Sequence, residues 1–303
     1  MNSVTRGSAL SLTLLVSTLL ACKGVQDMIG GANQDQALAS AAPVASAAAA
    51  PATPAAPSEV TFTKAVPKAG AKVKSESNTN VKFTFQGKVF RSTEVGSVAV
   101  DVQASDEFRI TKAALDVKDL FSTNQEGTGT EKKSVSPLAG SRFIVTRADD
   151  GKLSALDSSG NKVAAAQIGE IEKNYRSVFE RDKSREFLPN RPVKVGEKLT
   201  PSADAVLGLL GLKDDGSSTV DGVEFILKSA AEDKATFALS LTLTQKIPGG
   251  LRLRAKLEGT LDVRPRDTTF SNVSLRGPLT ILDAQGNDKG NGELSFTGAE
   301  TAS

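Results

Sequence analysis

The chain of 303 residues contains no histidine and no tryptophan, one cysteine and one tyrosine. Without histidine, neither a Ser-His-Asp nor a Cys-His catalytic arrangement is possible, and the usual zinc sites are excluded. With Tyr175 as the single tyrosine, aromatic platforms for sugars or single-stranded nucleic acid are not expected, although phenylalanine can serve in part. An enzyme would have to use carboxylates or a Ser-Lys pair, and neither forms a motif in this sequence.

The charge balance is close to even, with 37 Lys and Arg against 35 Asp and Glu and a formal net charge of +2. A chain of this kind lacks the strong positive footprint of a nucleic-acid-binding protein, although net charge can hide a local patch. No phosphate loop, dinucleotide-binding motif or nucleophile elbow is present. We therefore expect no enzyme, no cofactor and no nucleic-acid partner.

The single cysteine, Cys22, follows an apolar segment. Residues 1–9 carry one positive charge and no acid, and residues 10–20 are apolar apart from four Ser and Thr residues. This segment is too short for a stable membrane anchor and is typical of the hydrophobic region of a secretory signal peptide. The run Leu19-Leu20-Ala21-Cys22 resembles the lipobox of bacterial lipoproteins. The alternative is an ordinary signal peptide followed by an incidental cysteine.

The lipobox resemblance implies a signal peptide over residues 1–21 and lipidation of Cys22, which would become the mature N-terminus. Several acyl chains on one residue would hold the rest of the chain durably at a membrane surface. In lipoproteins generally, Asp after the cysteine favours retention in the inner membrane, and here that residue is Lys23. The resemblance thus implies the cell envelope, at the outer rather than the inner membrane, facing the periplasm or the cell surface.

Residues 37–57 consist almost entirely of Ala, Pro, Ser and Val. Their four prolines prevent a continuous helix, and no periodic apolar face can form. We expect residues 22–58 to be a disordered tether, the alternative being a part of the folded domain. Residues 59–300 then form a single β-rich domain.

Apolar residues alternate with polar ones in many short segments of this domain, which is the pattern of half-buried strands. The clearest case is a hairpin of residues 237–244 and 251–263 around Pro248-Gly249-Gly250, and a second hairpin is expected at residues 142–147 and 152–156. Further strands are predicted at residues 81–90, 95–102, 223–227, 270–275, 279–282 and 293–296.

Two segments are predicted to be helical. Residues 163–183 carry apolar side chains at spacings of three and four, which predicts an amphipathic helix of about five turns that packs on the sheet rather than docking a partner. Residues 202–212 predict a short apolar helix capped by Ser202 or Thr200. Its large apolar side chains fill the core or, alternatively, cover an apolar-ligand cavity: Val206, Leu207, Leu209, Leu210 and Leu212. The predicted fold class is α+β dominated by antiparallel β, a curved sheet or half-barrel packed on one long amphipathic helix and one short apolar helix.

Residues 188–199 read LPNRPVKVGEKL. This phrase, after a helix and before a run of antiparallel strands, resembles a group of uncharacterised bacterial secreted proteins and lipoproteins that carry P-V-K-V-G-(D/E) near the middle of a β-rich domain. The resemblance implies a β-rich domain over Val60 to Gly298 and implies no activity.

Two charged segments are candidate sites. Residues 283–293, DAQGNDKGNGE, faintly resemble a calcium loop but lack the EF-hand spacing, so we expect a hairpin turn there and no metal site. Arg252, Arg254 and Lys256 form a basic stripe on the polar face of one strand. Such a stripe is by default a solvated face, and the alternative is contact with anionic lipid or polysaccharide.

These observations favour a non-enzymatic cell-envelope lipoprotein anchored by its N-terminal lipid. A more specific hypothesis is that the concave face of the sheet in this lipoprotein binds a lipid or another apolar ligand. The alternative is an assembly or interaction protein that contacts an envelope partner through the basic strand face or a sheet edge.

Overall fold

The structure is a computed structural model that describes residues 58–302 apart from residues 65, 181–185, 211 and 213–215. The predicted signal peptide, Cys22 and residues 22–57 of the predicted tether lie outside the described residues. No helix in the described part of the chain combines the length and the apolar character needed to cross a membrane.

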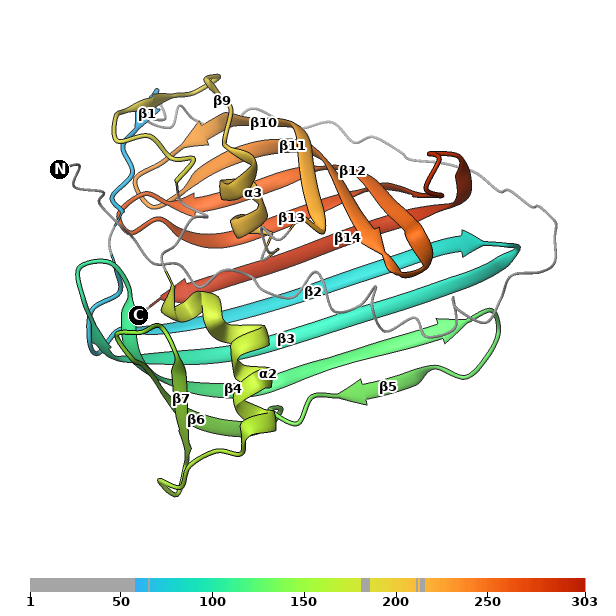
Figure 1. The fold of residues 1–303 in the computed structure, drawn as a ribbon. Helices are drawn as coiled ribbons and strands as arrows, with labels where there is room; N and C mark the ends of the chain where they lie inside the picture. The colour runs from blue at the N-terminus through green and yellow to red at the C-terminus, as the bar shows by residue number, and fades with distance from the viewer. Residues whose placement is uncertain (1–57, 65, 181–185, 211, 213–215, 303) are drawn as a thin grey trace, which may run out of the picture.

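The core of the fold is one open, antiparallel sheet of 12 strands (Figure 1). The chain builds one half with its first long strands and the other half with its last, and the final strand pairs with the first long strand to join them. From edge to edge the strands are β7 (Leu153–Asp157), β6 (Ser141–Arg147), β4 (Ile110–Glu126), β3 (Lys88–Ser105), β2 (Lys72–Phe85), β14 (Asp288–Ala302), β13 (Thr269–Leu282), β12 (Leu251–Arg264), β11 (Ala235–Ile247), β10 (Ser218–Ala230) and β9 (Lys198–Leu199), and β5 (Lys132–Val135) pairs with part of β4.

A separate ribbon lies beside this sheet. It consists of two antiparallel strands, β1 (Glu59–Val60) and β8 (Val193–Lys194). Strand β8 is the centre of the LPNRPVKVGEKL segment. The turn after β8 is stabilised by Glu197, whose carboxylate accepts a hydrogen bond of 3.0 Å from the Lys194 backbone N–H and pairs with Arg191. The phrase therefore has a structural role as a turn between two short strands.

Alternation of side chains explains where the strands form. Both predicted hairpins are confirmed, since β6 pairs with β7 and β11 pairs with β12 in register along their lengths. A single strand over residues 81–90 is wrong, because Gln86 and Gly87 have positive φ values of 50° and 75° and turn the chain between β2 and β3. Two consecutive positive φ values match the right-handed twist of the flanking strands in a two-residue hairpin.

The expected long helix is also wrong. The α-helix α2 (Ala165–Tyr175) has 11 residues and continues only as the 3₁₀ turn η2 (Arg176–Phe179). Tyr175 leaves the helical conformation with φ −129° and ψ 7°, so the buried Val178 and Phe179 reach the core from the 3₁₀ turn. Spacings of three and four residues are compatible with both geometries, and the sequence pattern could not separate them.

The short apolar helix is confirmed as α3 (Ala203–Leu209), and Ser202 is its cap, accepting a hydrogen bond of 3.3 Å from the Ala205 N–H. The predicted fold class is corrected in two respects. The described chain is mostly antiparallel strand with two short helices, and the sheet stays open at β7 and β9. Strand content was underestimated because several long strands bury serine and threonine where the pattern calls for apolar residues.

Both helices lie on one face of the sheet, over two separate hydrophobic clusters (Figure 1). The larger cluster joins α3 to strands β10–β14 and to the end of β2, whereas the smaller one joins α2 and η2 to β3, β4, β6 and β7. Between them lies a seam of buried polar residues on β2 and β3: Ser75, Ser77, Thr79, Ser92 and Glu94. The apolar core is therefore divided although the sheet is continuous.

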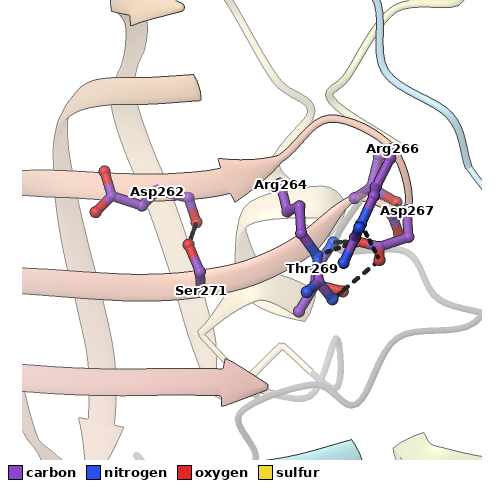
Figure 2. Close-up of polar contacts among 7 residues, drawn as sticks. Asp262, Arg264, Arg266, Asp267, Thr269 and Ser271 are labelled. Carbon is purple, nitrogen blue, oxygen red and sulfur yellow. Dashed lines mark hydrogen bonds and ion pairs between the residues drawn. The ribbon is translucent and has the colours of Figure 1, made fainter. Parts of the chain in front are cut away.

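The turn between β12 and β13 is held by ionic contacts (Figure 2). The Asp267 carboxylate accepts a hydrogen bond of 2.9 Å from Arg264 Nε and one of 3.1 Å from the Thr269 N–H, and Arg266 approaches it at 3.7 Å. Burial acts to raise the pKa of Asp267, but the hydrogen bonds from Arg264 and Thr269 outweigh it, so the pKa lies below its ordinary value. These contacts fix the end of the hairpin that positions the candidate site.

Candidate binding site on the polar face of the sheet

The face opposite the helices carries the polar side chains of every long strand. On β12, for example, Leu253, Ala255 and Leu257 are buried toward the helices, so Arg254, Lys256 and Glu258 project to the other side. This alternation was predicted, and it makes the second face of the sheet a charged surface.

A hollow of about 960 Å³ lies on this polar face, over strands β2, β3, β12, β13 and β14. Six charged side chains line it, together with uncharged polar residues, glycine and proline. The residues that line it are Asn80, Val81, Lys82, Arg91, Ser92, Thr93, Lys256, Glu258, Gly259, Arg276, Gly277, Pro278, Gly292, Glu293, Leu294 and Ser295. We call it the polar-face hollow.

An interruption in the ladder between β12 and β13 lies within the hollow. Pairing stops after Ala255–Leu279 and resumes at Glu258–Arg276, while β13 remains paired with β14 through Pro278. Proline has no backbone N–H, so Pro278 cannot donate to β12, and the Lys256 carbonyl opposite it loses its ladder donor. A proline in a central strand is unusual, and here it marks an irregularity in the sheet.

Glycines let the backbones approach closely beside this interruption. A Cβ on Gly277 would lie 1.8 Å from the Lys256 carbonyl oxygen, and a Cβ on Gly259 would lie 1.8 Å from the Ser274 carbonyl oxygen. No residue with a side chain fits at such distances. Glycine at these positions therefore permits the tight packing of β12 on β13. Both glycines stand at core-facing positions, in line with the buried Leu257 and Leu275, so they do not clear side chains from the polar face.

Cations outnumber acids in the hollow. Lys82, Arg91, Lys256 and Arg276 face two carboxylates, Glu258 and Glu293, which leaves a formal charge of +2 on the lining. Glu258 is directly opposite Arg276, and Glu293 is directly opposite Lys82.

These opposed pairs do not close into ion pairs. Among the described residues, no contact within 4.0 Å joins Lys82, Lys256 or Arg276 to a carboxylate, although ion pairs form elsewhere on the surface. Arg91 is partly engaged, donating from Nη1 to Gln125 Oε1 at 3.0 Å. The hollow therefore presents charged donors that remain available to a ligand.

The hollow differs from a second, smaller one on the same face. That hollow of about 420 Å³ includes Glu76 and Asp119 in its lining and has no lysine or arginine there. The smaller hollow thus lacks the cationic side chains that line the polar-face hollow.

The structure divides the basic stripe predicted on β12. Lys256 lines the hollow, Arg254 is exposed on the same face beyond the lining, and Arg252 turns away to donate from Nη2 to the carbonyls of Asp283 and Ala284 at 3.3 and 3.4 Å. Lys82, Arg91 and Arg276 were not predicted. Alternation marks their side chains as outward. The pairing of β12 with β13 brings Arg276 near Lys256, and the pairing of β14 with β2 brings Lys82 and Arg91 to the same surface.

The other predicted site residues have structural positions. Val206, Leu207, Leu209, Leu210 and Leu212 are buried in the larger hydrophobic cluster. Of residues 283–293, which were predicted to be a hairpin turn, only residues 283–287 form the turn between β13 and β14, and residues 288–293 belong to β14. Asp283 accepts hydrogen bonds from the Asn287 N–H at 2.9 Å and from Asn287 Nδ2 at 2.9 Å, which lower its pKa to about 2. Within the described residues, no group of three or more potential metal-ligating side chains occurs.

The fold thus defines an open antiparallel sheet protein with a charged hollow on one face. No family model and no curated protein sequence matches the chain. A solved structure on lipid-protein interactions in lipovitellin aligns with 78% of this chain at 7% identity and a TM-score of 0.38, and the chain spans 26% of that protein's length. DynF from the dynemicin biosynthesis pathway of Micromonospora chersina aligns with 78% of this chain and 82% of its own at 12% identity, with a TM-score of 0.23.

Proposed function

We propose that this chain is a non-enzymatic cell-envelope lipoprotein, anchored through Cys22, that binds an anionic ligand in the polar-face hollow. One observation carries the proposal: Lys82, Lys256 and Arg276 line a concave surface and make no ion pair within the described part of the chain, even where a carboxylate lies on the facing strand. A concave surface with an excess of one charge concentrates counter-ions of the opposite sign.

The donor set suits oxyanions. An ammonium group offers three donors and a guanidinium five, and neither can accept a hydrogen bond. Hydrogen bonds from such groups to phosphate or carboxylate oxygens are shorter and about twice as strong as neutral ones. Arg276 on β13 and Lys256 on β12 come from neighbouring strands, so one anionic group can contact both.

Titration calorimetry of tripolyphosphate binding to the purified full chain tests the proposed binding of an anion in the hollow. Arg276→Gln should weaken binding about tenfold, equivalent to about 1.4 kcal/mol, because one charge-assisted contact is lost. Arg254→Gln is the matched control, since Arg254 is exposed on the same face outside the lining. Equal losses in the two variants would show that general surface charge, and no particular site, attracts the anion.

The anchor is tested separately, in cells. Cys22→Ser should move the protein from the membrane fraction to the soluble fraction, because a serine side chain cannot take the thioether-linked lipid. Recovery of the variant with membranes at the wild-type level would contradict lipid anchoring at this residue.

A further inference from the structure

The polar-face hollow contains acceptors as well as cations, and this combination narrows the class of ligand. We infer that its ligand is an acidic oligosaccharide, a chain of sugar rings that bears carboxylate or phosphate groups. The inference rests on the proposed anion binding and adds that the ligand also supplies hydroxyl groups.

The two carboxylates carry the first step. Glu258 and Glu293 line the same hollow as the four cations, and each is directly opposite one of them on the next strand. A ligand that is anionic throughout would meet like charge at both positions. Ionised carboxylates only accept hydrogen bonds, so they favour a ligand that brings donors, such as the hydroxyl groups of a sugar.

The backbone supplies the second step. The Lys256 carbonyl lacks a ladder donor from Pro278 and belongs to a residue of the lining, so it is a further acceptor for a hydroxyl group. Gly277 and Gly292 stand at core-facing positions of β13 and β14, so only their backbone atoms belong to the lining. A sugar ring bound over β12 can therefore donate a hydroxyl group to this carbonyl while its acidic group extends to the cations around it.

Size is the third step. The volume of about 960 Å³ lies at the upper end of the range for small-ligand sites, about 300–1,000 Å³. It far exceeds the volume needed for one phosphate or one carboxylate group. It suits several linked rings, which carry acidic groups for the cations and hydroxyl groups for the two carboxylates of the lining.

Calorimetry on the purified full chain at constant ionic strength tests the inference with four probes. These are trigalacturonate, maltotriose 6-phosphate, neutral maltotriose and tripolyphosphate. We expect at least one acidic trisaccharide to bind about tenfold more tightly than both maltotriose and tripolyphosphate. The better of the two acidic sugars identifies the acidic group that the cations prefer.

The variants Glu258→Gln and Glu293→Gln sharpen this test. Each substitution should lower the affinity for the acidic trisaccharide about threefold to tenfold, because a strong hydrogen-bond acceptor is lost. Each should also raise the affinity for tripolyphosphate by a few fold, because a repulsive negative charge is removed. Glu232→Gln, in the exposed turn between β10 and β11, is the control and should change neither affinity. Thermal unfolding of each variant verifies that the fold is retained.

The possible failures are distinguishable. If tripolyphosphate binds as tightly as the acidic sugars, or if Glu258→Gln changes both affinities in the same direction, the inference is overturned while anion binding stands. If none of the anionic probes binds saturably, both the inference and the proposed function are overturned.

Discussion

Replacing Gly277 by alanine should destabilise the sheet at the centre of the hollow. The added Cβ would lie 1.8 Å from the carbonyl oxygen of Lys256 and 2.9 Å from its carbonyl carbon. A Cβ contact shorter than 3.0 Å essentially never occurs, so β12 and β13 would have to separate by more than 1 Å at this point. Both groups in the clash are main-chain atoms of a central strand pair, which cannot move aside as a flexible side chain can.

Two effects of opposite sign set the magnitude. Overpacking of this kind costs about 1–3 kcal/mol and sometimes more, and each weakened ladder hydrogen bond adds about 1 kcal/mol. Alanine reduces the entropy of the unfolded chain, which offsets about 0.4–1 kcal/mol. We therefore expect the free energy of unfolding to fall by about 2–4 kcal/mol. The same change should also weaken tripolyphosphate binding, because Gly277 lines the hollow.

Gly169→Ala is the matched control. Gly169 lies in α2, and a Cβ there would have no atom within 4 Å, so this substitution should stabilise the protein by about 0.5–1 kcal/mol. Urea unfolding of the purified full chain, followed by circular dichroism, measures both variants. If Gly277→Ala unfolds within about 0.5 kcal/mol of the wild type, the close approach of β12 and β13 is incorrect.

Two further predictions concern the turn at Asp283 and the helix α3. Asn287 lowers the pKa of Asp283 to about 2 from an ordinary value of 3.8, so the ionised group contributes stability above pH 4 that is lost as the pH falls toward 2. Asp283→Asn should thus be less stable than the wild type at pH 7 and equal to it at pH 2 in thermal unfolding, and a difference that is unchanged by pH would contradict the contact. Leu210→Ala should lower the free energy of unfolding by about 2–5 kcal/mol, because the Leu210 side chain is 0% exposed. A loss below 1 kcal/mol in urea unfolding would instead favour a helix that covers a ligand cavity.

Local patterns predicted much of the fold where one strand face is apolar. The alternation in residues 237–244 and 251–263 was sufficient to predict β11 and β12, because side-chain direction in a strand repeats every two residues. The same reasoning failed for β2, whose inward positions include Ser75, Ser77 and Thr79. Burial of these polar residues depends on neighbouring strands, and nothing in the local pattern reveals it.

The candidate site was predicted only in part. Lys256 was identified as an outward cation, but it was grouped with Arg252 and Arg254, its neighbours along the strand. The structure groups it instead with residues of other strands, above all Lys82 and Arg276. Neighbours across a sheet are set by strand order and register, and β2 and β14 are about 200 residues apart in the sequence.

The sequence by itself determined the strands that have one apolar side, such as β11 and β12, and the side of those strands that faces water, because these properties depend on residues close together in the chain. It also carries the run Leu19-Leu20-Ala21-Cys22, whose resemblance to a lipobox predicts attachment at Cys22. The tertiary structure alone decided the order of the strands, the break in the ladder opposite Pro278 and the meeting of four cations in one hollow. These features require strands distant in sequence to pair side by side, and pairing energies depend on the whole sheet.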